Sequence, residues 1–379
     1  MTAPVLPAQP LQPRNEDRTT VTPLEDRSPG YTERVAMFGV LTGGWTAQCC
    51  YALARLGVPD LLAAGPRPVA ELAAAAGADP HALRRVLGVL AAAGLFTEEP
   101  GDRYGLTPTT RLLCTDTTRS SSVAATLFGE EVYQSFGEIL HTLRTGRPAF
   151  EKVHGAPFYS YLEEHPESAA AFAAAMGSAS VPTALAGCDL TGLGTLVDVG
   201  GGEGGLLARV LGRHPQARGV LVELPKSVAQ ARAKLAAAGV ADRVEFAPGS
   251  FFDPLPAGGD VYTLTRVLHN WDDEQALAIL RRVREAIPEH GRLLVFERLE
   301  EEPGTAAEPP SSERAAQAAF QGRLIDLLML LTLDGRDRTE AEYRTLLTTA
   351  GFEVRAVRSA PLRSARAESL IEAVPVPAK

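Results

Sequence analysis

A cluster of glycines follows a short apolar segment near the middle of the chain. Residues 196–199 are typical of a buried strand, and the residues after them include Gly200, Gly201, Gly202, Gly204 and Gly205. Glycine allows backbone angles that other residues resist, and it lets a ligand lie against bare main chain. The helix predicted directly after the cluster offers unpaired N–H groups and a partial positive charge, which favour an anion. The cluster therefore indicates a nucleotide-like ligand, although its spacing fits both G-x-G-x-x-G and G-x-G-x-G.

An acid ends the next predicted strand, residues 219–223. The carboxylate of Glu223 can accept hydrogen bonds from both hydroxyls of a ribose, in a nicotinamide cofactor as well as in an adenosyl cofactor. The alternative is an ordinary solvated glutamate at a strand end. The distance from the glycines to Glu223 favours the ribose-binding interpretation.

A histidine lies between a predicted strand, residues 260–267, and a predicted helix, residues 273–287. The ordinary pKa of His269, about 6.5, suits a general base near neutral pH. Glu297 is the first polar residue after a further predicted strand, and Asp337 lies in a charged loop. A carboxylate can orient a histidine and stabilise its cation. The alternatives are a structural histidine, a strand-end glutamate and a surface aspartate.

Two further segments carry polar or aromatic residues at predicted strand ends. Ser250 and Phe251 follow the predicted strand 243–247, where a small polar residue and an aromatic ring can bind and cover an adenine. Phe251 and Phe252 can equally be core residues, because aromatic side chains are mostly buried. Arg266 stands where a nearly all-apolar strand is expected to continue.

The second half of the chain alternates predicted strands and helices, which is typical of a parallel sheet with helices on both faces. Ligands of such sheets bind beyond the carboxyl ends of the strands. That edge is expected to collect Gly200, Glu223, Ser250, His269 and Glu297. The remaining expected elements are a mobile loop at 299–314, a buried helix at 315–331, a helix at 339–350 capped by Thr339 and Glu342, and two antiparallel strands at 352–358 and 369–374.

The first half of the chain is predicted to be helical. Residues 1–28 have little to bury, so we expect a disordered arm. A long helix over 34–56 contains three glycines that allow a second helix to approach closely, which favours a dimer contact. Three short helices and a hairpin over 57–113 predict a winged helix. Further helices are predicted at 127–143, from 158 and at 167–186, with a loop at 145–156.

The charge and composition of the chain restrict its partners and its compartment. The formal net charge of −9 argues against nucleic acid, because a protein that binds the nucleic-acid backbone needs a basic face. A winged-helix DNA-binding regulator stays as a disfavoured alternative. Arg84 and Arg85 are too few cationic residues for the several contacts that the DNA backbone requires. The four cysteines show no zinc spacing and indicate core residues in a reducing compartment. With no signal-peptide pattern and no apolar run near the roughly 20 residues that span a bilayer, we expect a cytoplasmic protein.

Six motifs occur in an order and at distances that match a known family. They are LVDVGGGEGG, Glu223-Leu224-Pro225, PGSFFDPLP, LHNWDDE, the strand that ends in Glu297, and GRDRTEAEY. Through them, residues 35–374 resemble the S-adenosylmethionine-dependent small-molecule O-methyltransferases of the caffeic-acid type, in their bacterial natural-product branch. The resemblance implies an α/β fold: a Rossmann-like class I methyltransferase domain, whose parallel sheet has a C-terminal antiparallel hairpin, preceded by an α-helical winged-helix dimerisation domain.

The resemblance also implies boundaries for these parts. We expect the dimerisation domain at 29–115, a helical connector that lines the substrate pocket at 116–186, and the S-adenosylmethionine-binding catalytic domain at 187–379. Apolar residues expected to wall the pocket are Phe150, Phe158, Phe320, Met329 and Leu330, although each can equally be plain core.

A binding site for S-adenosylmethionine is the next implication of the resemblance. Gly200 matches the position that contacts the methionine part of the cofactor, and Glu223 matches the position that holds the ribose hydroxyls. Ser250 and Phe251 match the positions that flank the adenine, with Ser250 in place of an acid common in the plant enzymes. The remaining cofactor positions are matched by Arg266, where plant members have lysine, and by Met176 and Ser180 in the alanine-rich helix.

The chemistry follows from the same resemblance. His269 matches the catalytic base that removes the proton of an acceptor hydroxyl, and Glu297 and Asp337 match the two acids that position it. Asp337 replaces a more usual glutamate, and Asn270 replaces an aspartate of many plant members. The implied enzyme is a homodimer that methylates a small aromatic acceptor without a metal, in secondary metabolism such as antibiotic biosynthesis.

Two other enzyme classes remain open. A relative with the same fold can bind S-adenosylmethionine and catalyse hydroxylation or decarboxylation; some bacterial members of this kind lack the histidine, so His269 favours methyl transfer. A nicotinamide oxidoreductase shares the glycine turn and the strand-end acid, but nothing in the sequence supplies a nicotinamide half with its own acid and base. Within methyl transfer, the identity of the acceptor and the choice between O-, N- and C-methylation stay open.

Overall fold

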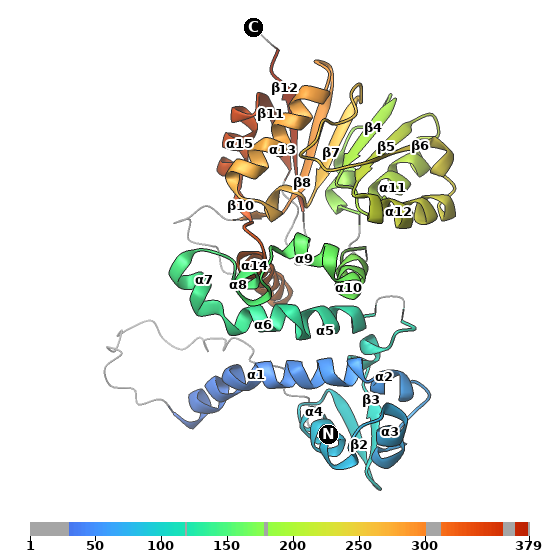
Figure 1. Ribbon diagram of the computed structural model, residues 1–379, viewed down its shortest axis with the longest axis vertical. Coiled ribbons are helices and arrows are strands. Elements are labelled where there is room, and N and C mark those ends of the chain that lie inside the picture. The colour runs from blue at the N-terminus through green and yellow to red at the C-terminus, as the bar shows by residue number, and fades with distance from the viewer. Residues whose placement is uncertain (1–29, 118–119, 178–180, 301–311, 359–367, 378–379) are drawn as a thin grey trace. The chain divides into compact units, whose positions relative to one another are not determined.

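The computed structural model describes residues 30–117, 120–177, 181–300, 312–358 and 368–377 (Figure 1). The expected arm at 1–28, most of the expected loop at 299–314, and Ser180 lie outside these residues. The chain forms two compact units. One comprises Met1–Tyr133 and Pro166–Ala175, and the other comprises Gln134–His165 and Met176–Lys379. The expected connector at 116–186 is therefore divided between the two units.

The first unit contains the predicted winged helix. The long helix α1 (Tyr31–Arg55) is followed by α2 (Val58–Leu61), α3 (Val69–Ala76) and α4 (Pro80–Ala92), and then by the hairpin of β2 (Phe96–Glu99) and β3 (Arg103–Leu106). A short strand, β1 (Arg67–Pro68), pairs with β3. Helix α4 has a capped start, because the side chain of Asp79 accepts the N–H of Ala82 and Pro80 occupies the first helical position.

The helices after the hairpin are shorter than predicted. The single helix expected at 127–143 is wrong: α5 (Ser122–Gly129), α6 (Glu131–Gly137) and α7 (Ile139–Thr145) replace it. A Cβ added to Gly129 would lie 2.3 Å from the Tyr51 ring of α1, and the Gly129 carbonyl accepts the side-chain amide of Gln48 at 2.9 Å. Helix α5 therefore ends at a glycine that lies directly against α1, where a larger side chain would clash with Tyr51.

The loop expected at 145–156 is also wrong, because α8 (Ala149–His154) forms there and buries Phe150. Gly146 and Gly155 are the left-handed C-caps of α7 and α8, so these glycines end helices instead of marking a loop. The next helices are α9 (Phe158–Glu164) and α10 (Pro166–Gly177), and a 3₁₀ turn at Thr183–Gly187 replaces the end of the helix expected at 167–186.

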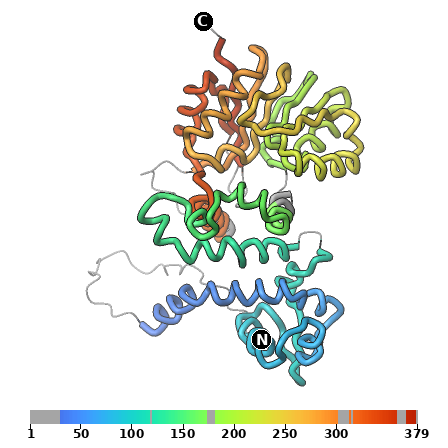
Figure 2. The backbone as a smooth tube through the Cα atoms, viewed as in Figure 1, coloured from blue at the N-terminus to red at the C-terminus, as the bar shows by residue number. Residues whose placement is uncertain are grey.

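The second unit is built on a sheet whose seven strands, in the described part of the chain, have the order β11-β12-β8-β7-β4-β5-β6. Neighbours run parallel except β12, which is antiparallel to both β8 and β11; Figure 2 shows this late red segment returning beside β8. The fold class predicted from the sequence is confirmed. The strand bounds are β4 Thr195–Val199, β5 Arg218–Glu223, β6 Val244–Pro248, β7 Val261–Thr265, β8 Arg292–Glu297, β11 Phe352–Arg358 and β12 Ser369–Pro375.

Helices cover both faces of this sheet (Figure 1). Along β4, Val197 and Val199 pack into one core together with residues of α13 (Asp273–Ala286) and α15 (Glu340–Thr349). Leu196 points to the other face, where α11 (Gly205–Arg213) and α12 (Pro225–Ala237) cover it. This alternation is the two-residue period of a strand that is buried on both sides.

Two helices of this unit have side-chain caps. Asp272 caps α13 by accepting the N–H of Gln275, and Thr339 with Glu342 forms the capping box of α15. The helix α14 (Glu313–Thr332) forms where a buried helix was expected, but it is not buried throughout in the single chain, because the Phe320 side chain is 58% exposed. None of the described helices is long and apolar enough to cross a membrane.

Candidate active site

The candidate site lies at the carboxyl ends of the parallel strands. Gly200 directly follows β4, Glu223 ends β5, and Glu297 ends β8. The His269 turn, a short 3₁₀ segment at Leu268–Asn270, follows β7. The parallel register of these strands brings all four segments to one edge of the sheet, as the sequence predicts.

The imidazole of His269 faces two carboxylates. Its Nδ1 atom lies 3.7 Å from Oε2 of Glu297 and 3.7 Å from Oδ1 of Asp337, and the side chain is 15% exposed. The residues come from three separate segments, the end of β8, the turn after β7 and the loop after α14. The structure thus brings together the three residues that the sequence proposes for catalysis.

Glu297 supports the His269 turn as well as the imidazole. Its Oε1 atom accepts the backbone N–H groups of Val267 at 3.0 Å and Leu268 at 2.9 Å. Its Oε2 atom is buried, has no hydrogen-bond partner among the described residues, and is the atom that faces Nδ1. One carboxylate therefore fixes the backbone of the turn and leaves its second oxygen for the ring.

Asp337 is held from two sides. Its Oδ2 atom pairs with Nε of Arg298 at 2.5 Å, and its backbone N–H donates to Oδ1 of Asp326 in α14 at 2.8 Å. These contacts aim Oδ1 at His269. The shorter side chain of Asp337, compared with the glutamate expected from the family, therefore still reaches the imidazole.

The charges around His269 favour its cation. Burial lowers the pKa of His269 and Arg266 lowers it further, but Glu297 and Asp337 outweigh both, so the pKa is raised above its ordinary value of 6.5. A histidine in this setting accepts a proton readily, because the two acids beside Nδ1 stabilise the cation that forms, and this is the property that a general base needs.

The turn between β4 and α11 has the geometry of a ligand cradle. Gly200 has a φ of +70°, and a Cβ there would lie 2.9 Å from Cγ2 of Val267, so a larger residue meets both backbone strain and a clash. Glu223 reaches across the turn, since Oε2 accepts the Gly202 N–H at 2.9 Å and Oε1 accepts the Leu224 N–H at 2.8 Å. Burial raises the pKa of Glu223, and this effect outweighs the two hydrogen bonds, which lower the pKa.

Asp198 is a buried acid in β4 that the sequence interpretation missed. Its Oδ1 atom accepts the Thr263 hydroxyl at 2.8 Å, while Oδ2 has no partner among the described residues. Burial raises the pKa of Asp198 to about 7. A Cβ on Gly201 would lie 2.4 Å from Oδ2, so this oxygen lies directly beneath the glycine turn. The available signal was a charged residue inside an otherwise apolar strand.

The other predicted cofactor residues have different surroundings. The Ser250 hydroxyl accepts the Phe252 N–H at 3.2 Å, and Phe251 lies next to the glycine turn, 3.5 Å from a Cβ placed on Gly200. Arg266 has a φ of +55° and pairs with Glu368 at 3.4 Å, beside β12. Met176 is in α10, and its side chain, like Ser180, lies outside the described part.

An aromatic cluster borders this cradle. The Tyr159 ring of α9 stacks on Trp271 with ring centres 5.7 Å apart, and Trp271 meets Phe251 and Phe252 edge-on at 5.8 and 5.0 Å. Burial and the charge of Glu223 both raise the pKa of Tyr159. The sequence interpretation missed Tyr159, because a tyrosine in a short helix resembles a core residue.

The expected pocket residues are of two kinds. Phe150 and Phe158 are buried and pack edge-on against each other at 5.0 Å, and Met329 is buried as well. Phe320 and Leu330 of α14 are exposed in the single chain.

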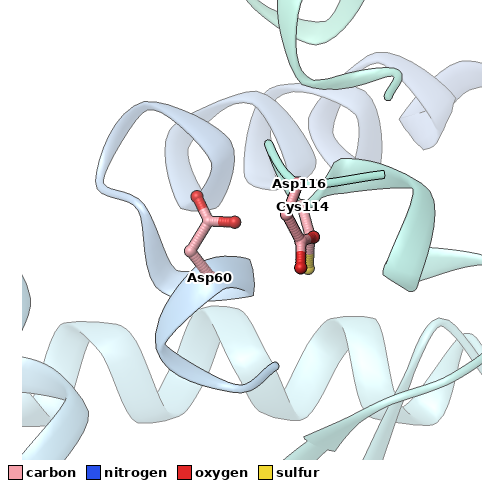
Figure 3. A group of neighbouring side chains, drawn as sticks. All are labelled: Asp60, Cys114 and Asp116. Atoms are coloured by element: carbon pink, nitrogen blue, oxygen red, sulfur yellow. The ribbon is translucent and has the colours of Figure 1, made fainter. Parts of the chain in front are cut away.

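Asp60, Cys114 and Asp116 form a small group in the first unit whose possible ligand atoms lie within 4.8 Å of one another (Figure 3). The guanidinium of Arg111 donates to both carboxylate oxygens of Asp116 at 2.9 Å. Asp60 accepts the N–H of Thr115 at 2.8 Å. Because protein donors already engage both acids, the group carries no argument for a metal.

Two family models match the chain. The O-methyltransferase domain matches residues 136–353, and the O-methyltransferase dimerisation domain matches residues 38–116. Phenazine O-methyltransferase PhzM of Lysobacter antibioticus is 38% identical over 89% of this chain and 95% of its own length. O-demethylpuromycin-O-methyltransferase of Streptomyces alboniger is 40% identical over 91% of this chain and 92% of its own.

A solved structure agrees with these matches. It is the O-methyltransferase NcsB1 from neocarzinostatin biosynthesis, in complex with S-adenosylmethionine and 2-hydroxy-5-methyl naphthoic acid. It is 34% identical and superposes with a TM-score of 0.75 over 87% of this chain and 96% of its own. The chain belongs to the family of S-adenosylmethionine-dependent O-methyltransferases with an N-terminal dimerisation domain.

Proposed function

We propose that this enzyme methylates a hydroxyl group of a small aromatic acceptor of the natural-product type, with His269 as general base. The observation that carries the proposal is the imidazole of His269, whose Nδ1 faces the carboxylates of Glu297 and Asp337 at 3.7 Å each. A base is needed for a hydroxyl acceptor, because a phenol with a pKa of about 10 is mostly neutral at pH 7 and a poor nucleophile. The relatives named for phenazine and puromycin support an acceptor of this class.

In the proposed mechanism the two ring nitrogens of His269 have different roles. The N–H at Nδ1 is directed to Glu297 and Asp337, which leaves Nε2 to accept the proton of the acceptor hydroxyl. The two acids then stabilise the imidazolium that forms. S-adenosylmethionine supplies a methyl group that its sulfonium makes electrophilic. No residue in this scheme needs a metal ion, so we propose that turnover persists in the presence of EDTA.

The cradle residues fit an adenosyl amino acid. Bare main chain at Gly200 and the Oδ2 atom of buried Asp198, which has no hydrogen-bond partner among the described residues, suit the methionine part, whose amino group can donate to a carboxylate. The Glu223 oxygens each keep a lone pair for the ribose hydroxyls, because each accepts a single backbone N–H. Phe251 is proposed to cover the adenine, with Ser250 beside it. Arg266, Met176 and Ser180 complete the proposed set.

We also propose a homodimer in which residues 29–115 form the dimerisation domain. The long helix α1 exposes a run of large apolar side chains, including Phe38, Leu41 and Trp45 at 64, 71 and 66%. A contiguous exposed apolar surface of this kind marks an association site. Residues 116–186 are proposed as the connector and 187–379 as the catalytic domain. The four cysteines are free thiols, which supports a reducing, cytoplasmic environment.

The proposed function is tested with a panel of aromatic acceptors. Purified enzyme is incubated with S-adenosylmethionine and with phenazines, aromatic polyketides and phenolic amino acids, and the products are analysed by mass spectrometry. We expect a mass gain of one CH₂ unit on a hydroxyl-bearing acceptor, and no gain on the matched compound in which that hydroxyl is already methylated. A gain of oxygen or a loss of carbon dioxide would instead favour the hydroxylase or decarboxylase alternative.

A further inference from the structure

We propose that Arg338 is a positioning residue that fixes the His269 turn in the orientation needed for proton transfer. The proposal rests on the proposed role of His269 as the base. Arg338 directly follows Asp337, lies in the short strand β10 (Arg338–Thr339), and has a fully buried side chain. In the sequence it is one of two arginines in the charged segment GRDRTEAEY, which gives no sign of burial.

The guanidinium of Arg338 binds both ends of the His269 turn. Nη1 donates to the carbonyl of Leu268 at 2.9 Å, and Nη2 donates to the carbonyl of Trp271 at 2.7 Å. Nε donates to Oδ1 of Asp273, in the first turn of α13, at 2.8 Å. Leu268 precedes His269 and Trp271 follows it by two residues, so one rigid group spans the turn. A planar guanidinium offers donors in this fixed fork, whereas an ammonium does not.

A second contact holds the turn from the same segment. A Cβ on Gly335 would lie 2.0 Å from the carbonyl oxygen of His269 and 2.5 Å from the carbonyl carbon of Asn270. The backbone at Gly335 therefore packs directly on the backbone of the His269 turn. Between Gly335 and Arg338, Asp337 presents its carboxylate to the imidazole. This four-residue segment contacts the turn at its back, at its two ends and at the ring.

A separate two-stranded sheet holds the backbone of Arg338 close to Glu297. In β10, Arg338 pairs in parallel with Leu299 of β9 (Leu299–Glu300), which lies two residues after Glu297. The backbone of Arg338 is thus tied to the same segment that carries Glu297. The arrangement fixes both carboxylates and the turn relative to one another, and a shift of about 1 Å in such a group can cost about 100-fold in rate.

The decisive variants are Arg338→Lys and Arg338→Met, studied in the full-length enzyme. We expect kcat to fall about 100-fold, with the KM for the acceptor and the Kd for S-adenosylhomocysteine unchanged. The pKa of His269, followed by NMR of ¹⁵N-histidine-labelled protein, is expected to fall towards its ordinary value because the ring no longer faces both acids. The His269 resonance is identified by its loss in His269→Ala. Arg344→Met is the matched control, since Arg344 is half exposed on α15 and pairs with Glu340 of the same helix.

The outcomes separate this proposal from the proposed function. If His269→Ala keeps full activity, the base assignment fails. If His269→Ala is inactive but the Arg338 variants keep both kcat and the pKa of His269, the positioning role is overturned while the base assignment stands. Lower kcat with an unchanged His269 pKa also overturns it, because that pattern reflects general destabilisation. Should both Arg338 variants fail to fold, Gly335→Ala displaces the same turn from its other side. This variant is expected to show the same fall in kcat and the same fall in the pKa of His269.

Discussion

The Oε2 atom of Glu297, buried and without a hydrogen-bond partner among the described residues, lies 3.7 Å from Nδ1 of His269. The other oxygen of the same carboxylate holds the backbone of the turn that carries the histidine. Glu297 therefore contributes both to the orientation of the ring and to the stabilisation of its cation. This coupling makes the pH dependence of the reaction a direct probe of the site.

Replacement of Glu297 by glutamine is expected to move the pH profile of kcat to lower pH. The pKa of His269 is raised above 6.5 by Glu297 and Asp337 against burial, so the neutral base accumulates as pH rises through this raised value. With the Glu297 charge removed, the pKa of His269 falls and the rising limb moves with it, while kcat falls because the imidazolium loses support. Glu285→Gln, at an exposed ion pair with Arg282, is the control. A profile identical to the wild type would contradict the interaction.

His269→Ala is expected to keep cofactor affinity and to lose most turnover, about 100- to 10,000-fold. The substitution removes the proposed base and leaves the glycine turn and Glu223 in place. Binding of S-adenosylhomocysteine is measured by calorimetry and turnover by product formation. Turnover equal to that of the wild type would remove His269 from the base role.

The affinity for S-adenosylmethionine is expected to weaken as pH falls through about 7. Burial raises the pKa of Asp198 to about 7, so its carboxylate is ionised above this pH and neutral below it. Only the ionised form offers Oδ2 as an acceptor with full charge. We expect Asp198→Asn to weaken binding at pH 8 and to abolish the pH dependence, as measured by calorimetry at pH 6 and pH 8. The same variant is expected to be more stable than the wild type at pH 8, because it removes a buried charge.

Tyr159 is expected to contribute to cofactor binding through its ring. It stacks on Trp271, which touches Phe251 at the glycine turn. Tyr159→Ala should raise the Kd for S-adenosylhomocysteine. Tyr159→Phe keeps the ring and should keep the wild-type Kd. Equal Kd values for both variants would exclude a ring contribution.

The elements that the sequence predicts well are those whose pattern is local. The strand before Gly200 and the capping box at Thr339 each depend on a few consecutive residues, and both are present. The sequence predicts a loop at 145–156, where α8 forms. A glycine that ends a helix, as Gly146 does, and a glycine in a loop look the same in a sequence. Whether a helix continues past Gly129 depends on Tyr51, which is far away in the chain.

The same distinction applies to the site. His269, Glu297 and Asp337 could be proposed because parallel strands bring their carboxyl ends to one edge. Arg338 could not, because its burial depends on carbonyl groups of the His269 turn, which only tertiary structure brings to it. Asp198 was visible as an acid in an apolar strand, yet only the folded structure shows that its Oδ2 atom has no partner among the described residues.

The proposed homodimer predicts that charges on α1 separate the subunits. Phe38 and Leu41 are 64 and 71% exposed in the single chain, and a charge placed there would have to be desolvated in an apolar interface. The wild type is expected to scatter light as twice the chain mass of 40.2 kDa, and Phe38→Asp and Leu41→Asp as a single chain. Val376→Asp is the matched control, because Val376 is 45% exposed but lies outside residues 29–115, the proposed dimerisation domain. A wild type that is monomeric at micromolar concentration, or a Leu41→Asp variant that remains dimeric, would show that α1 is not the contact.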